Sequence, residues 1–352
     1  MQNYHFGTIK YLLTIAKPDI LAVEIRPKDL RAKNYSKTPF DIAKVVIPWA
    51  QEHGVSVSGI DFWENSARKK HNQFMRKLKK TKDGIEKLQA APDEIQIHKD
   101  RFANIDEVTL DYVHSEEFSS KDYEVRQSHT RLFGEGPGNL FWYTRANMMN
   151  TLLADVIKKN EGKRIVVVTG AAHRGDLERF LANKNGIRII RLSELDGIGN
   201  LPTYESYIGA LPADELLELI CYYVQGKKAN NDPDSVNLGL LDKMLAIYKT
   251  SQNTEYLDLY QAEYFYLSRQ YTEALASFRK AKEYLKGKTF FGLDAASFLD
   301  IRIANMLDLL GEREQAIAIY RHCAKKFSRI ALLARYFLAN PCKRPTPASK
   351  TH

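Results

Sequence analysis

A short segment near the middle of the chain, Gly170-Ala171-Ala172-His173, contains the residue types most suited to chemistry. It follows Ile165 to Val168, a β-branched run that predicts a strand covered on both faces. In open α/β sheets, ligands bind just outside the carboxyl ends of the strands, where this segment would lie. Gly170 leaves room for a ligand, and the imidazole of His173 can act as base, acid or metal ligand. The alternative is that His173 only begins the following helix, predicted over 176–181.

Two carboxylates are predicted at comparable positions. Glu24 stands near the end of an apolar strand predicted over 20–25, and Asp61 follows a second strand predicted over 55–60. A carboxylate in an apolar strand is costly unless it is paired or functional. Glu24 is therefore a candidate metal ligand, general base or arginine partner, and Asp61 a candidate ligand-binding residue. The alternatives are a water-exposed edge strand for Glu24 and helix capping for Asp61.

Arg145 is the third candidate catalytic residue, and it would hold the substrate or an oxyanion. It begins an otherwise apolar helix, and its planar fork of donors suits a substrate carboxylate, a phosphate or Glu24. The alternative is a surface pair with Glu135 or Asp155. Trp142 precedes it by three residues and is a candidate ligand-binding residue together with Gly170.

The elements that position these residues alternate between helix and strand, which predicts an α/β domain over 1–212 with a mainly parallel sheet and flanking helices. A charged, mostly helical insertion is expected over about 64–130, as a covering for the carboxyl edge of the sheet. Its expected breaks are Ala91-Pro92 and Ser119-Ser120. The other predicted elements are helices over 11–16, 41–53 (kinked at Pro48 and ended by Gly54) and from 145, a flexible turn over 134–138, and a strand over 187–191.

The chain changes character near Pro212. Residues 213–340 read as helix throughout, and a motif of small and aromatic residues occurs twice, with Ala274 and Phe278 matched by Ala316 and Tyr320. This pattern is typical of tetratricopeptide (TPR) repeats, which bind protein partners on a concave face. The extra length between the two copies is assigned to a loop over 286–294. An ordinary helical bundle is the alternative, and the tail over 341–352 is expected to be disordered.

Composition excludes several classes of protein. The three cysteines, Cys221, Cys323 and Cys342, are too far apart for a CxxC zinc site. Neither a signal peptide nor a membrane-spanning run is visible, so a cytoplasmic location is the default expectation. The formal net charge is +9, with a basic cluster over 68–82. We expect this cluster to be a solvated helix face, with Phe74, Met75 and Leu78 turned inward, and nucleic acid to be the least favoured partner.

The order of these features resembles the TIKI/TraB superfamily, including ChaN-like haem-uptake and erythromycin-esterase-like proteins. The resemblance covers residues 1–195 and rests on the segment from Pro18 to Glu24, on Arg145 with the two methionines that follow it, and on the segment from Val166 to His173. It implies that Glu24, Arg145 and His173 line one pocket, used in different branches for metal-dependent proteolysis, ester cleavage or haem binding.

Members of this superfamily carry two Gly-x-x-His motifs, whereas this sequence shows one. His5 lies near the expected place without a preceding strand, so the first motif is expected either upstream of Met1 or not at all. The resemblance implies a hydrolase of an ester or amide in a small molecule or peptide. A divalent metal on Glu24 and His173 is one candidate cofactor. The alternative is a degenerate scaffold that binds haem or another anion and recruits a protein through its helical domain.

Overall fold

The structure is a computed structural model that describes residues 5–36, 38–93, 96–97, 109–136, 139–228, 238–251, 256–290, 293–326 and 329–342. The chain divides into two compact units, Met1–Tyr207 and Ile208–His352. This division falls a few residues before the boundary expected at 212, and the predicted tail beyond Cys342 lies outside the described residues. Each unit is described by itself. Among the described helices, none is both long and apolar enough to cross a bilayer.

Unit 1 is built on a parallel sheet of three strands, in the order β2-β1-β3. The strands are β1 (Ile20–Val23), β2 (Ser56–Gly59) and β3 (Ile165–Val168). In register, Ile20 pairs with Ser56 on one side and with Ile165 on the other. The predicted parallel sheet with flanking helices is thus present, although most of the unit is helical.

Alternate residues of the strands pack into two hydrophobic clusters, one on each face. Leu21 and Val23 join the helices that precede β2, and Ile20 and Ala22 join those that flank β3. All four residues of β1 are buried, as expected for a central strand. The residues of β3 are only partly buried because β3 forms an edge of the sheet, although both of its faces are covered. The same geometry removes the edge-strand alternative for Glu24.

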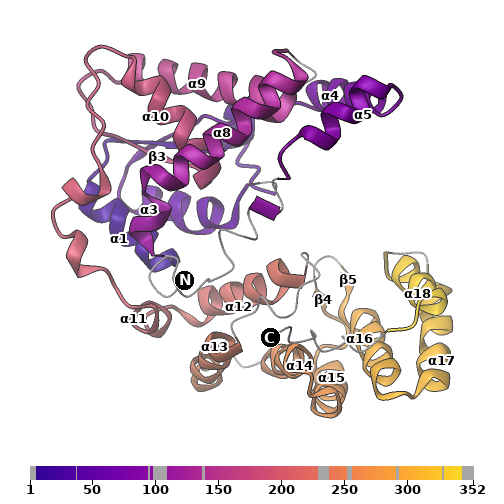
Figure 1. The fold of residues 1–352 in the computed structure, drawn as a ribbon. Coiled ribbons are helices and arrows are strands. Elements are labelled where there is room, and N and C mark those ends of the chain that lie inside the picture. Colours follow the sequence, from indigo (N-terminus) through magenta and orange to yellow (C-terminus); the bar gives the residue numbers. More distant parts are fainter. Residues whose placement is uncertain are drawn as a thin grey trace, which may run out of the picture. The chain divides into compact units, whose positions relative to one another are not determined.

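Helices cover both faces of the sheet (Figure 1). One face is covered by α1 (Phe6–Ala16) and by η1 (Ile42–Val46) with α3 (Ile47–Glu52), and the other by α9 (Arg145–Lys159) and α10 (Arg174–Ala182). The remaining elements are α2 (Pro27–Arg31), α4 (Asn65–Leu78), α5 (Lys82–Ala90), α7 (Leu110–Val113), α8 (Glu116–Phe133), η3 (Leu140–Thr144), η4 (Ala171–His173), η5 (Leu192–Glu194), η6 (Ile198–Asn200) and α11 (Tyr204–Gly209).

Two turns of π-helix lie in unit 1, one ahead of Pro48 and one ahead of Arg145. The first, η1, lies directly before Pro48, where a kink was predicted. Proline has no N–H and crowds the preceding turn, so the helix widens ahead of it. The second, η3, leads directly into Arg145. Gly54, at a φ of +65°, follows α3 and ends it as predicted.

Two predicted features of unit 1 are wrong. Ser119-Ser120 does not break the insertion, because Ser115 caps α8 and Ser119 is buried within that helix. Residues 187–191 form no strand. The segment is rich in isoleucine, which favours an extended conformation, but among the described residues none pairs with its backbone in a ladder. Arg188 and Arg191 instead form ion pairs with Glu194 and Glu178.

The amino terminus of α1 is packed around His5. Its Nδ1 accepts a hydrogen bond from the Thr8 N–H at 3.3 Å, and its Nε2 lies 3.0 Å from the Pro202 carbonyl oxygen. The ring also stacks on Tyr207. Burial lowers the pKa of His5 and outweighs the raising effect of the Pro202 carbonyl and Glu205. Both ring nitrogens are thus used in structure, and His5 is a helix cap in the described conformation.

Unit 2 is a row of helices in which each packs on the next. They are α12 (Ala213–Lys228), α13 (Leu238–Thr250), α14 (Leu257–Leu267), α15 (Tyr271–Tyr284), α16 (Ala295–Leu310), α17 (Arg313–Ala324) and α18 (Arg329–Ala339). In the loop predicted over 286–294, β4 (Thr289–Phe290) and β5 (Leu293–Asp294) form a short antiparallel ladder.

The residues of the repeated motif form the core of unit 2. Ala274, Phe278, Ala316 and Tyr320 are each fully buried in a single cluster. The small residues let neighbouring helices approach, and the aromatic rings fill the space between pairs. The motif therefore correctly identified the packing face of α15 and α17.

Candidate functional site

The candidate site lies where the three strands end. Glu24 follows β1 directly, Asp61 comes two residues after β2, and Gly170 comes two residues after β3. Backbone hydrogen bonds continue slightly past the ladder, from Glu24 N–H to Val168 O and from Asp61 N–H to Ile25 O, both at 3.1 Å. Because the strands are parallel, their carboxyl ends meet at one edge of the sheet and the three positions become neighbours.

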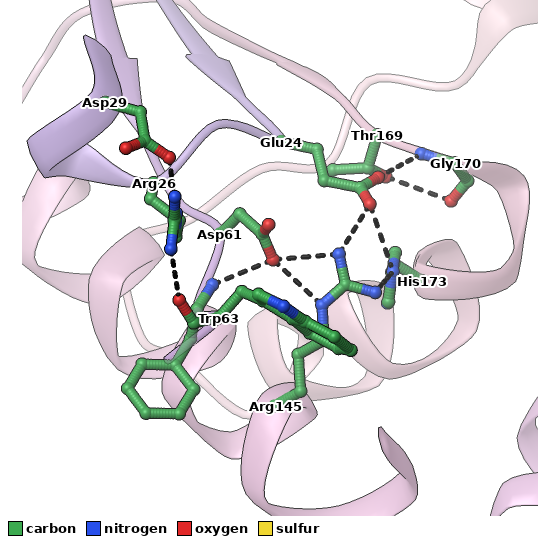
Figure 2. A network of polar contacts seen from close by, with 10 residues as sticks. Glu24, Arg26, Asp29, Asp61, Trp63, Arg145, Thr169, Gly170 and His173 are labelled. Carbon is green, nitrogen blue, oxygen red and sulfur yellow. Dashed lines mark hydrogen bonds and ion pairs between the residues drawn. The ribbon is translucent and has the colours of Figure 1, made fainter. Parts of the chain in front are cut away.

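Arg145 joins these strand ends (Figure 2). Its Nη2 donates to Glu24 Oε1 at 2.7 Å, its Nε donates to Asp61 Oδ1 at 2.8 Å, and its Nη1 lies 3.1 Å from His173 Nε2. The side chains of Arg145, Glu24 and Asp61 are 18%, 10% and 14% exposed. Of the predicted protein partners, the structure selects Glu24 over Glu135 and Asp155, and it adds Asp61. One guanidinium bridges two carboxylates and an imidazole, and these four side chains are called the Arg145 network below.

Glu24 is held as a carboxylate. Its Oε2 accepts the Gly170 N–H at 2.6 Å, and its Oε1 lies 3.5 Å from His173 Nε2. Burial by itself raises the pKa of Glu24, but His173, the Gly170 N–H and Arg145 outweigh it and bring the pKa to about 2. Gly170 thus contributes its backbone N–H, and a Cβ there would lie 3.4 Å from Glu24 Oε2.

His173 stands in the cap position of α10, but its side chain makes no capping hydrogen bond. Its Nε2 faces Arg145 and Glu24, and its Nδ1 is buried with no hydrogen-bond partner in the described part of the chain. Nε2 thus has a donor on one side, the Arg145 N–H, and an acceptor on the other, Glu24 Oε1, so it can accept from Arg145 or donate to Glu24. His173 is therefore the N-cap residue by position, while its side chain is directed at Arg145 and Glu24.

A second buried ion pair fixes the turn that carries His173. Arg126 of α8 pairs with Asp176 of α10 and also donates to the Ala172 carbonyl oxygen. Burial raises the pKa of Asp176 and outweighs the lowering effect of Arg126. Helices α8 and α10 approach closely here: a Cβ on Gly175 would lie only 2.5 Å from the Ser119 carbonyl oxygen, so only glycine fits at this position. Arg126 was missed by sequence reasoning, although it shares a buried face of α8 with Phe118 and His129.

The aromatic ring beside Arg145 belongs to Trp63, whose centroid lies 5.9 Å from the guanidinium carbon. The backbone of Trp63 is held by Arg26, whose Nη1 donates to the Trp63 carbonyl oxygen at 2.6 Å. Trp142, the predicted ligand-binding residue, instead stacks on His129 with ring centroids 3.9 Å apart. A π-turn sets the helical phase between residues 142 and 145, so Trp142 packs against α8 while Trp63 lies beside Arg145.

The donor set does not fit the predicted metal ion in this conformation. Catalytic zinc usually takes three protein ligands. No group of three or more His, Cys, Asp or Glu residues suited to a metal occurs in the described ranges. The Arg145 guanidinium also contacts both Glu24 Oε1 and His173 Nε2, so a fixed positive charge stands beside the two proposed ligands. A cation between these ligands would have to displace Arg145 and overcome its repulsion.

Comparisons with known proteins add no family. No protein-family model matches the chain, and neither the search of curated proteins nor the search of solved structures finds a match. The resemblance to the TIKI/TraB superfamily therefore stays a prediction.

Proposed function

We propose that unit 1 is a hydrolase of an ester or amide bond, acting through His173, Glu24 and Arg145 without a metal ion. The observation that supports this proposal is the convergence of two carboxylates, a guanidinium and an imidazole at the carboxyl ends of parallel strands. Four ionisable side chains this close together and this well buried are costly for a purely structural purpose, and such sets are concentrated at functional sites.

The chemistry proceeds from the bonds already present. When a substrate binds, its carbonyl oxygen accepts the hydrogen bond from Arg145 Nη1. It thereby takes the place of His173 Nε2 as the partner of that N–H. The freed Nε2 then takes a proton from water as the water oxygen attacks the carbonyl carbon. Arg145 stabilises the resulting oxyanion. The imidazolium, stabilised by Glu24, returns its proton to the leaving alcohol or amine as the carbon–oxygen or carbon–nitrogen bond breaks.

For unit 2 we propose a TPR-like role in binding a protein partner. Support comes from the repeated small and aromatic residues at the contacts between helices and from the row in which each helix packs on the next. Stacked helix pairs present extended surfaces of the kind that repeat proteins use to hold other chains.

One observation favours a second function for the Arg145 network. Each of the three guanidinium nitrogens of Arg145 already has a partner within the protein. An arginine whose donors are all used within the protein fits a non-catalytic scaffold, and the predicted form of that scaffold binds haem or another anion. In that case an anionic group would compete with Glu24 and Asp61 for Arg145.

Hydrolysis of a panel of chromogenic esters and fluorogenic peptides by the full chain distinguishes the two functions. His173→Asn and Arg145→Lys are each expected to lose at least about 100-fold in kcat/KM. His322→Asn, at an exposed histidine of unit 2, is the matched control and should leave the rate unchanged. Activity that survives in folded His173→Asn refutes the hydrolase proposal. Haemin binding that is lost in Arg145→Lys, with no hydrolysis of any substrate, supports the scaffold.

A further inference from the structure

The exposed face of α4 has an unusual concentration of positive charge. Its seven cations, within the helix and directly after it, are all exposed: Arg68, Lys69, Lys70, Arg76, Lys77, Lys79 and Lys80. The opposite face contains buried Ala67 and His71 and half-buried Phe74, Met75 and Leu78, which are turned inward as predicted. Hydrophobic residues therefore fix the orientation of the helix and direct its cations to solvent.

These seven cations have no ion pair with any described residue. Several other surface cations of unit 1 do form ion pairs, as in Lys121–Glu117 and Arg174–Glu178, although exposed Lys158, Lys159 and Lys163 form none with a described residue. The acids that follow on α5 are already used, because Glu86 and Asp83 pair with Lys82 and Lys87. The basic face of α4 is consequently a region of uncompensated positive potential, which attracts anionic partners.

Helix stability explains only part of this charge. Arg76 and Lys77 lie in the last turn of α4, where cations interact favourably with the helix dipole. Arg68, Lys69 and Lys70 lie in the amino-terminal half, where the dipole gives them no such advantage. Like charges in one short segment also repel one another. Their presence there points to a binding role.

The side chains between the cations indicate which anion the face would bind. Arg68, Lys69 and Arg76 line a shallow depression together with Asn65, Asn72 and Gln73. Amide side chains donate hydrogen bonds to phosphate oxygens and sugars. A helix that binds a membrane surface instead needs large apolar residues to insert, and the apolar side chains of α4 face the protein.

We propose that the basic face of α4 binds the phosphate backbone of nucleic acid without sequence preference. At 14 residues, α4 is about 21 Å long, so several successive phosphates of a strand fit along it. This inference concerns a surface distinct from the Arg145 network and does not depend on the proposed hydrolase. It also departs from the low rank that the sequence alone assigned to nucleic acid, because the structure shows seven cations without an acidic partner.

The test is the salt dependence of binding to a fluorescently labelled single-stranded oligonucleotide, measured by anisotropy with the full chain. The variant Arg68→Gln/Lys69→Gln/Lys70→Gln removes the three cations that the helix dipole does not stabilise. The control Lys158→Gln/Lys159→Gln/Lys163→Gln removes the same charge from exposed lysines at the end of α9 and in the turn after it. Circular dichroism verifies that both variants remain folded.

We expect the α4 variant to bind at least about tenfold more weakly, with a salt slope smaller by about 2 for three lost phosphate contacts. The control should retain the slope of the unmodified chain. Equal losses in the two variants would mean that only net charge matters, and the proposal would be wrong. Binding to vesicles that contain phosphatidylserine, without binding to RNA or DNA, would also overturn it.

Discussion

The low pKa of Glu24 makes a quantitative prediction about stability. In the folded protein this pKa is about 2, against an ordinary value of 4.5. Each pKa unit corresponds to about 1.4 kcal/mol of differential interaction, so the ionised carboxylate stabilises unit 1 by about 3 kcal/mol. Solvent screening reduces this figure little, because the side chain is only 10% exposed. We predict that Glu24→Gln, which keeps the size but removes the charge, loses most of this amount at pH 7.

The sign of the pH dependence follows from the direction of the pKa shift. A depressed folded pKa contributes stability that is fully present above the unfolded value and is lost as the pH falls towards the folded value. The difference in unfolding free energy between the two proteins should therefore be constant above about pH 5.5 and about 1 kcal/mol smaller at pH 3.5. Other acidic groups titrate in both proteins, and their contributions cancel in the difference.

Urea unfolding followed by tryptophan fluorescence measures this difference in one unit of the chain. All three tryptophans, Trp49, Trp63 and Trp142, lie in unit 1, so their emission reports on the unit that contains Glu24. A loss below about 1 kcal/mol at pH 7, or a difference that is the same at pH 7 and pH 3.5, would refute the assignment of Glu24 as a strongly stabilised carboxylate.

Two further predictions concern packing in each unit. Gly59→Ala places a Cβ 2.4 Å from the Ile25 carbonyl oxygen, a backbone atom that cannot turn aside, and should cost about 2 kcal/mol in the tryptophan-detected transition. Gly199→Ala, with open space around it, should change stability by less than about 0.5 kcal/mol, and equal effects would contradict the reasoning. In unit 2, Arg302 donates to both carboxylate oxygens of buried Glu263, at 3.1 and 2.7 Å. Arg302→Met should cost about 3 kcal/mol in the helical dichroism transition, and adding Glu263→Leu should recover most of it, because the single change leaves an unpaired buried charge.

Much of the site could be predicted from the sequence because parallel strands bring their carboxyl ends to one edge. Glu24, Asp61 and Gly170 each follow a strand, and this rule alone makes them neighbours. Arg145 was a stated partner for Glu24 because a buried carboxylate requires a cation. These inferences rest on where strands end and on the need to balance a buried charge, and both can be recognised in short segments of the sequence.

Other features of unit 1 could not be predicted from the sequence, for physical reasons. Trp142 is a predicted ligand-binding residue, but the ring beside Arg145 is that of Trp63, and the π-turn before Arg145 could not be read from the sequence. The 187–191 segment has the β-branched residues of a strand, yet composition does not reveal whether a neighbouring strand exists to pair with it. Arg126 and Asp176 were missed because their pairing depends on the close approach of α8 and α10, which no local pattern encodes.

The order of strands in the sheet also bears on how the two units are synthesised and fold. The central strand β1 pairs with β3 on one side, and the flanking residues Asp19 and Arg164 are 145 positions apart. On a ribosome that adds ~5–20 residues per second, β1 emerges many seconds before its second neighbour exists. During that time an entirely apolar strand has an unpaired edge, which is a template for aggregation. Unit 2 needs no such delay, since each of its helices packs on the next. We therefore expect unit 1 to determine the folding yield of the chain and its dependence on chaperones.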